Sequence, residues 1–438
     1  MTADAEAWIV VDLGFGDAGK GLLTDHLVRR LGAHTVVRFH GGAQAGHNVV
    51  TADGRHHTFS QLGAGTVVPG VRTYLSRDVV IHPSALLVEA AHLAEVGVPD
   101  ALERLEVSEE ALVITPFQQA AGRLRERARG DGAHGSCGVG FGETVRDALG
   151  STVEPVRAGE LRDLHRLRAK LLRVQEHKRA ELRADLGAPA GWLDAERRIL
   201  EDTGPLDRWR AILAKLPLGS LVDEGAALRR MFARRGALVL EGAQGVLLDE
   251  WRGFHPHTTW STCTFERALA LLRGADRAPV RLGVLRTYAT RHGAGPLPTE
   301  DRTLDALLPE PHNQTHPFQG RFRRGWFDAV LARYALEAVG GVDRFALTHL
   351  DAVDRLERWR MAIAYAHRGT RIERLPLGVA GDLDHTAALG VTLRAVEPAW
   401  SEPRPTRAAV LEAIESALEI PVSFTATGPT AADVAPRA

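Results

Sequence analysis

The chain has little cysteine, almost no net charge and no long apolar run. Its 438 residues include only two cysteines, Cys137 and Cys263, which cannot form a disulfide framework and suit a reducing compartment. Lys and Arg number 54 and Asp and Glu 55, so a net charge of −1 gives no global attraction to nucleic acid or an anionic membrane. No apolar run reaches the roughly 18 residues of a membrane-spanning helix, and MTADAEAW at the start does not read as a signal peptide. We therefore expect a cytoplasmic, enzyme-sized protein.

What the sequence does contain is an alternation of short apolar runs, Gly-rich loops and helix-like segments. The runs are WIVVDL, TVVRF, DVVIH, ALVLEGAQG, RLGVLRTY and RFALTHLD. This alternation predicts an α/β fold, a large single domain with a long, mostly parallel central sheet. Ligands bind such sheets beyond the carboxyl ends of the strands, which is where the Gly-rich loops are expected.

The domain organisation is expected to be simple. We expect one domain over residues 1–430, with a helical insertion at 158–215 and a disordered tail at 431–438. The stretch 158–187 is strongly charged and is typical of a solvated amphipathic helix, with nucleic-acid binding as the less favoured alternative. The end of the chain, TAADVAPRA, is expected to fray.

The first Gly-rich loop lies in VVDLGFGDAGKGLLTDHL (10–27) and is P-loop-like with two unusual residues. Gly-x-x-x-x-Gly-Lys is ordinarily followed by a Ser or Thr that holds magnesium, but here Gly21 follows Lys20. Backbone N–H groups at the loop and the Lys20 ammonium would attract phosphate. Asp17 would repel it, so we expect Asp17 to hold magnesium or to take a proton from a substrate. A helix-capping aspartate and a structural turn with a chance lysine are the alternatives.

A second loop, RFHGGAQAGHNVV (38–50), also follows a strand-like run directly. Its paired glycines would let the backbone approach a ligand closely, with His47 projecting from the turn. His47 would then donate a proton or a hydrogen bond to a transferring phosphoryl group, although a purely structural histidine is an equal alternative.

Together, GDAGKG and GGAQAGH resemble the adenylosuccinate synthetase family, which typically reads GDEGKGK and GGHNAGH. The resemblance continues in the family's order through LEGAQGVLLDEWRGFHPHTT, GVLRTYATRHGAGPLPTE, GRFRRGWFDAVLARYA, RFALTHLDAVD and ATGP. It implies one large α/β domain, a homodimer with shared sites, and a ligase that uses GTP and Mg²⁺. In that reaction the 6-oxygen of inosine monophosphate (IMP) is phosphorylated, and the amine of aspartate then displaces phosphate.

The resemblance also implies roles for individual residues. Asp17 would bind magnesium and take the proton from purine N1, Gly46 would give a carbonyl to the metal, and His47 would assist phosphoryl transfer. The GTP-binding positions would be Gly16, Gly19, Lys20, Gly21, His349, Asp351, Gly428 and Pro429. The positions facing the nucleotide substrate would be Gln44, Gly135, Ser136, Gln244, Thr259 and Arg321. The positions facing the amino acid would be His292, Phe318, Gln319, Arg321 and Arg323.

The sequence departs from the family pattern mainly at substrate positions. The replacements are Ala18 for Glu, Leu22 for Lys, Gln44 for Asn, His292 for Val, Phe318-Gln319 for Thr-Thr, and His349 for Lys. Losing two hydroxyls at 318–319 would remove hydrogen bonds to a carboxylate, and the phenyl ring would narrow the pocket. For the arginine that reaches the partner subunit's nucleotide, Arg146 is only a nearby candidate.

These departures leave alternatives open. A paralogue could act on another oxo-nucleotide or another amine, and ATP could replace GTP. Alternatives of other classes are a non-catalytic nucleotide-binding regulator and a kinase that leaves its phosphate on the product.

Overall fold

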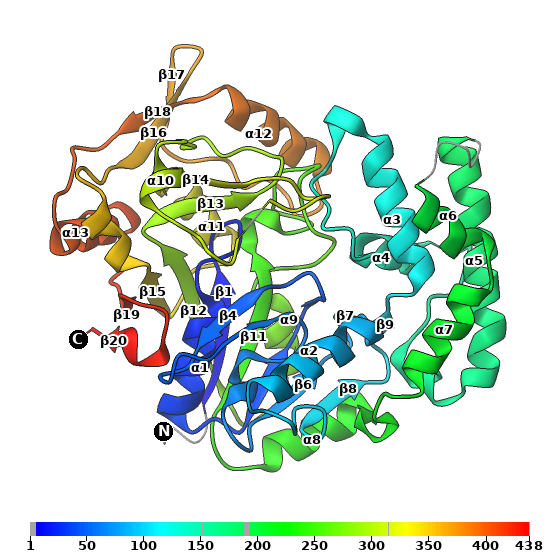
Figure 1. Cartoon of the computed structure of the whole chain (residues 1–438). Helices are drawn as coiled ribbons and strands as arrows, with labels where there is room; N and C mark the ends of the chain where they lie inside the picture. The colour runs from blue at the N-terminus through cyan, green and yellow to red at the C-terminus, as the bar shows by residue number, and fades with distance from the viewer. Residues whose placement is uncertain (1–5, 151, 188–192, 314, 438) are drawn as a thin grey trace.

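A ten-stranded sheet forms the centre of the protein. The computed structural model describes residues 6–150, 152–187, 193–313 and 315–437. The first five residues of the N-terminal stretch MTADAEAW therefore lie outside the described residues. The strand order is β10-β8-β6-β2-β11-β1-β12-β15-β19-β20 (Figure 1). The strands span Leu221–Val222 (β10), Leu105–Ser108 (β8), Arg72–Leu75 (β6), Thr35–Arg38 (β2), Leu238–Gly245 (β11), Glu6–Asp12 (β1), Ala278–Arg286 (β12), Arg344–Thr348 (β15), Phe424–Ala426 (β19) and Val434–Pro436 (β20). Every neighbouring pair is parallel except β19 and β20, which confirms the predicted α/β fold.

The central strand β1 shows why this sequence forms a sheet covered on both faces. Its residues from Ala7 to Asp12 are all buried, which is typical of a parallel strand between two layers of helices. Trp8 and Val10 pack into one apolar cluster with α1 (Lys20–Leu31), whereas Ile9 and Val11 pack into another on the opposite face. The side-chain period of two therefore assigns alternate residues to the two cores.

The remaining helices pack around this sheet, and some of them form a helical lobe on one side. They span Pro83–Glu95 (α2), Pro116–Ala128 (α3), Phe141–Leu149 (α4), Leu164–Leu186 (α5), Asp194–Glu201 (α6), Gly204–Leu213 (α7), Glu224–Ala233 (α8), Glu266–Leu271 (α9), Leu304–Leu307 (α10), Ala329–Ala338 (α11), Leu383–Ala395 (α12) and Arg407–Leu418 (α13). Helices α5, α6 and α7 occupy the segment expected to be a helical insertion, and they stand beside α3 at the right of Figure 1. Leu171, Val174 and Leu182 of α5 join a core shared with α3, so this charged helix is only partly a solvated surface.

A second sheet lies beyond the carboxyl end of β12. Its strands span Tyr288–His292 (β13), Phe322–Asp328 (β14), Met361–His367 (β16), Thr370–Ile372 (β17) and Glu397–Trp400 (β18). Two small sheets complete the fold: β3 (Gly41–Gly42) with β7 (Val79–Ile81) and β9 (Leu112–Val113), and the hairpin β4 (His47–Val50) with β5 (His56–Phe59). Among the described residues, no helix has both the length and the apolar character needed to cross a membrane.

The expectation of a disordered tail is wrong for those residues of the tail that the structure describes. Residues Ala431–Asp433 form a 3₁₀ turn, and β20 then pairs antiparallel with β19. The Asp433 carboxylate accepts hydrogen bonds from the N–H (2.9 Å) and the hydroxyl (2.7 Å) of Thr430, which fixes the turn. Val434 is only 5% exposed and packs in the core around α1. Residue 438 lies outside the described residues.

This packing predicts a measurable contribution of the last strand to stability. Val434→Ser removes buried apolar surface, so we expect the free energy of unfolding to fall by about 1–3 kcal/mol in urea titrations followed by circular dichroism. Ala435→Ser is the matched control, because Ala435 is the exposed neighbour on the same strand. Equal stabilities of the two variants would contradict a packed β20.

Candidate active site

A cavity of about 1110 Å³ opens where the carboxyl ends of β1, β11, β12 and β15 meet. The parallel register brings the loops after these strands together, although they come from distant parts of the sequence. The predicted site residues on the cavity wall are Gly16, Asp17, Gly19, Lys20, Gly21, Gln44, Gly46, His47, Gly135, Ser136, Gln244, Thr259, His292, Gln319, His349, Asp351, Gly428 and Pro429.

The phosphate loop is organised by Asp12, a residue that the sequence reasoning missed. One carboxylate oxygen of Asp12 accepts from the Gly14 N–H (2.8 Å), and the other accepts from the Ala18 N–H (2.8 Å) and the Lys20 ammonium (3.0 Å). The Asp12 and Lys20 side chains are 0% and 2% exposed. The signal in the sequence was an acid at the end of an otherwise apolar strand, two residues before the first glycine of the loop.

Gly21 stands where a P-loop carries Ser or Thr, and the packing explains the replacement. A Cβ at this position would lie 2.8 Å from the backbone oxygen of Asn48 and 3.0 Å from the Cβ of His47. The start of α1 therefore approaches β4 too closely for any side chain at Gly21. The hydroxyl that usually holds magnesium is excluded sterically, and the same contact places His47 beside the loop.

Asp17 sits in a strained and desolvated position on the cavity wall. Its φ of 63° lies in the left-handed region, which non-glycine residues rarely adopt. The Arg286 guanidinium donates to the Asp17 backbone oxygen (3.1 Å), and Nε2 of His292 lies 3.4 Å from the carboxylate. Burial raises the pKa of Asp17 above its usual value, while His292, Lys20 and Arg286 act in the opposite direction. Such a carboxylate is suited to accept a proton or to hold a cation.

His47 is held between two hydrogen-bond acceptors. Its Nδ1 lies 2.7 Å from the Glu241 carboxylate, and its Nε2 lies 3.1 Å from the backbone oxygen of Ala243. Burial lowers the pKa of His47, whereas the charge of Glu241 raises it. Both partners favour a doubly protonated ring, but burial outweighs them, so the pKa of His47 lies below its ordinary value.

Two glutamine side chains on the cavity wall have unused hydrogen-bonding capacity. All amide oxygens and nitrogens of Gln44 and Gln244 are buried without a partner among the described residues. Each such group carries a penalty of about 1–3 kcal/mol until a partner arrives. Both side chains lie against the Gly41–Gly42 turn, so the two amides are positioned together to recognise a polar ligand.

Other predicted positions are fixed by hydrogen bonds of their backbone N–H groups. Glu126 of α3 accepts from the N–H groups of Gly135 (2.7 Å) and Ser136 (3.0 Å). The Thr259 N–H donates to the Leu248 backbone oxygen (2.8 Å), which holds that loop beside β11. Ser136 and Thr259 both line the cavity.

His349 and Asp351 follow β15 and line the same cavity. Burial, reinforced by the charge of Arg286, lowers the pKa of His349 to about 3, so this ring is neutral. Its Nδ1 lies 2.9 Å from the Thr348 hydroxyl. Arg286 also pairs with Glu310. Burial acts to raise the pKa of Glu310, but the charge of Arg286 holds this pKa at about 2. A neutral histidine thus replaces the positive charge that a lysine would bring.

Three predicted residues do not line the cavity in this structure. Glu300 accepts from Arg321 (2.5 Å) and from Arg323 (2.7 Å), and Asp305 accepts from Arg321 (2.9 Å). The Phe318 ring lies against the guanidinium groups of two residues of α3, Arg123 (5.4 Å) and Arg127 (5.6 Å). The expectation that Phe318 narrows the pocket is therefore wrong here, because cation–π packing turns the ring toward α3.

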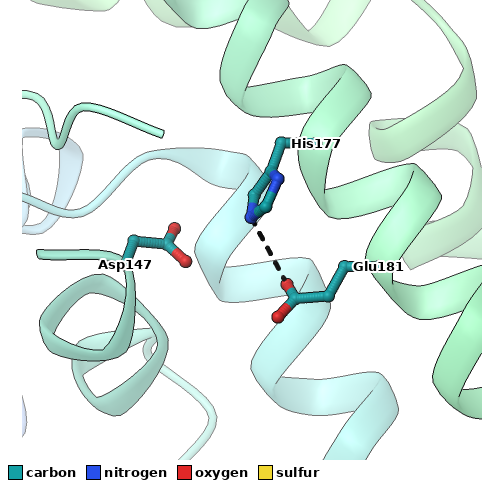
Figure 2. Close-up of side chains that lie close together, drawn as sticks. All are labelled: Asp147, His177 and Glu181. Carbon is teal, nitrogen blue, oxygen red and sulfur yellow. Dashed lines mark ion pairs between the residues drawn. The ribbon is translucent and has the colours of Figure 1, made fainter. Parts of the chain in front are cut away.

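A separate group of ligand-type side chains joins α4 to α5. Asp147, His177 and Glu181 lie close enough together to hold a metal ion (Figure 2). The Lys178 ammonium already pairs with Asp147 and with Glu181 (2.9 Å), and the guanidinium of Arg146 pairs with Glu181 (2.8 Å). Because these cations neutralise the carboxylates, the group is a partly buried ion-pair network between helices, distinct from the predicted magnesium ligands Asp17 and Gly46.

Comparisons with known proteins identify the family of the chain. The family model described as adenylosuccinate synthetase matches residues 9–435. The adenylosuccinate synthetases of Xanthomonas euvesicatoria pv. vesicatoria and Alkalilimnicola ehrlichii are 31% and 33% identical to the chain, each covering 96% of it and 96% and 95% of their own lengths.

Two solved structures share the fold. The fully ligated adenylosuccinate synthetase of Plasmodium falciparum has a TM-score of 0.79 at 20% identity and covers 98% of this chain and 99% of its own. Cyanophage S-2L succinoaminodeoxyadenylate synthetase, bound to dGMP and to dATP as an energy donor, has a TM-score of 0.58 at 21% identity, with 98% and 95% coverage.

The His47–Glu241 contact can be tested in the absence of any ligand. In Glu241→Gln the carboxylate charge that raises the pKa of His47 is lost while burial remains, so we expect this pKa to fall further. NMR titration of histidine-labelled protein measures it, with circular dichroism as a check on folding. An unchanged or higher pKa of His47 would contradict the electrostatic coupling.

Proposed function

The chain belongs to the adenylosuccinate synthetase family of C–N bond-forming ligases, and on this basis we propose that it joins aspartate to carbon 6 of IMP with GTP and Mg²⁺. The observation that carries the proposal is the meeting of Asp17, Lys20, His47 and the two unpaired amides around one cavity. A nucleotide-binding regulator has no need of an acid and a base at the phosphate loop, so this combination supports the ligase.

The first step is phosphorylation of the purine 6-oxygen. A lactam oxygen is a poor nucleophile until N1 is deprotonated, and the desolvated Asp17 carboxylate is the base that takes this proton. The 6-oxygen then attacks the γ-phosphate of GTP, and GDP leaves. Loop N–H groups and the Lys20 ammonium stabilise the transferring phosphoryl group, and His47 donates a hydrogen bond to it.

The chain offers ligands that suit magnesium. The Asp17 carboxylate and the backbone oxygen of Gly46 are hard oxygen donors on the cavity wall, and burial keeps Asp17 poorly solvated until a cation or proton arrives. Asp17 and Gly46 would hold Mg²⁺, which when bound supplies positive charge to the phosphate oxygens.

In the second step the amine of aspartate attacks carbon 6 and the phosphate group leaves. His292 and Gln319 lie on the wall near Asp17, so they would contact the amino acid. Arg321 and Arg323 would receive its carboxylates by exchanging them for Glu300 and Asp305. Bidentate arginine–carboxylate pairing makes such an exchange favourable for a dicarboxylate.

We propose GTP as the phosphoryl donor because Asp351 lies on the cavity wall with Gly428 and Pro429. A carboxylate there can accept hydrogen bonds from the N1–H and 2-amino group of guanine, which adenine cannot offer. The family resemblance also supports a homodimer, and the low cysteine content supports a cytoplasmic location.

Asp17→Asn tests the proposed base. The amide cannot take the N1 proton, so phosphate release from GTP with magnesium, IMP and aspartate should fall by at least about 100-fold. Asp25→Asn is the control, because Asp25 is a buried aspartate of α1 that pairs with Arg29 and does not line the cavity. Aspartate-dependent phosphate release at the wild-type rate in Asp17→Asn would exclude Asp17 as the base.

Asp351→Asn tests the choice of nucleotide. Losing the carboxylate acceptor should lower kcat/KM for GTP by roughly 10- to 100-fold and reduce the preference for GTP over ATP. Asp354→Asn is matched, because Asp354 belongs to the same 3₁₀ segment but pairs with Arg407 at the surface. If both variants keep the same GTP preference, Asp351 does not read the base.

A further inference from the structure

The phosphate loop of this chain differs from an ordinary P-loop in its charge. The Lys20 ammonium, which would normally meet a phosphate as a free charge, lies 3.0 Å from the Asp12 carboxylate, and both side chains are almost fully buried. The same carboxylate also receives the N–H groups of Gly14 and Ala18, at 2.8 Å each. Asp12 therefore engages two backbone donors and the one cation of the loop before any ligand arrives.

Two other buried cations near the loop are also paired with carboxylates. Arg286 pairs with Glu310, and Arg38 lies 3.9 Å from Glu241. The charged and titratable groups that act on the Asp17 carboxylate are His292, Lys20, Arg286 and Asp12. Lys20 and Arg286 are each paired with a carboxylate of their own, and Nε2 of His292 lies 3.4 Å from the Asp17 carboxylate. The cavity wall thus presents the Asp17 carboxylate to an incoming triphosphate.

We propose that Asp12 is a positioning residue that cancels the charge of Lys20 and thereby makes triphosphate binding conditional on a divalent cation. The inference rests on the proposed function, in which the loop binds the phosphates of GTP. Asp17 repels the triphosphate, and Lys20 offsets this repulsion less while Asp12 shares its charge. An added cation at Asp17 supplies the missing positive charge, so nucleotide and metal should bind together.

The test is the affinity of the full chain for GTP, measured by isothermal titration calorimetry with excess magnesium and with EDTA at equal ionic strength. In the wild-type protein, removal of magnesium should weaken binding by at least roughly tenfold. Asp12→Asn keeps the shape of the side chain but frees the Lys20 charge. We expect this variant to bind GTP in EDTA roughly tenfold more tightly than the wild type, so that its dependence on magnesium shrinks.

Two further variants separate charge from loop structure. In Asp12→Asn/Lys20→Met both charges are absent, so the magnesium dependence should return to that of the wild type, which a loosened loop would not produce. The double variant also replaces Asp12→Asn in this test if that single variant unfolds, because a buried ion pair can often be replaced by neutral groups without loss of stability. Asp25→Asn, which alters the ion pair between buried Asp25 and exposed Arg29 of α1, away from the cavity, should leave the magnesium dependence unchanged.

The outcomes distinguish this inference from the proposed function. If folded Asp12→Asn binds GTP in EDTA no better than the wild type, or if the double variant loses the magnesium dependence, the role of Asp12 is overturned while the ligase proposal stands. If the wild-type protein does not bind GTP even with magnesium, the proposed function fails first.

Discussion

Two buried carboxylates on adjacent central strands hold the site together. Asp12 ends β1 and binds Lys20, and Glu241 in β11 binds His47. Because β1 and β11 are parallel neighbours, with Val10 opposite Glu241, the sheet register sets the position of the phosphate loop relative to His47. A shift by one residue would move each carboxylate to the opposite face of the sheet and separate the two groups.

Several features of the site destabilise the free protein, and the rest of the fold must offset this destabilisation. Gln44 and Gln244 keep unpaired amides, Asp17 has a strained backbone, and its carboxylate is desolvated. Each of these features destabilises the free protein by about 1–3 kcal/mol. They are confined to loops at one edge of the sheet, while both faces of β1 pack into continuous apolar cores. A rigid scaffold thus maintains a set of groups that become fully paired only with ligands.

The sequence was sufficient for what depends on local pattern. Apolar runs followed by glycines predicted the parallel sheet and placed the ligand loops at the carboxyl ends of its strands. Asp17 and His47 were candidates from those loops, the family resemblance added Gln244, and all three line the cavity. What it could not predict depends on contacts between distant segments. The pairing of Arg321 with Glu300 and the packing of Phe318 on α3 leave no periodic signal, and the order of the last strand depends on its partner β19.

The two unusual residues of the phosphate loop are linked by one steric constraint. Gly21 lets β4 approach the start of α1, because any Cβ there would collide with the backbone of Asn48. This approach brings His47 next to the loop but removes the hydroxyl that a P-loop uses to bind magnesium. In the proposed function an oxygen ligand would come from another position, and Asp17, which has a left-handed backbone and lines the cavity, is placed to supply it. The glycine and the aspartate would then belong to one arrangement, in which His47 lies beside the loop and a carboxylate that can accept a proton also serves as the metal ligand.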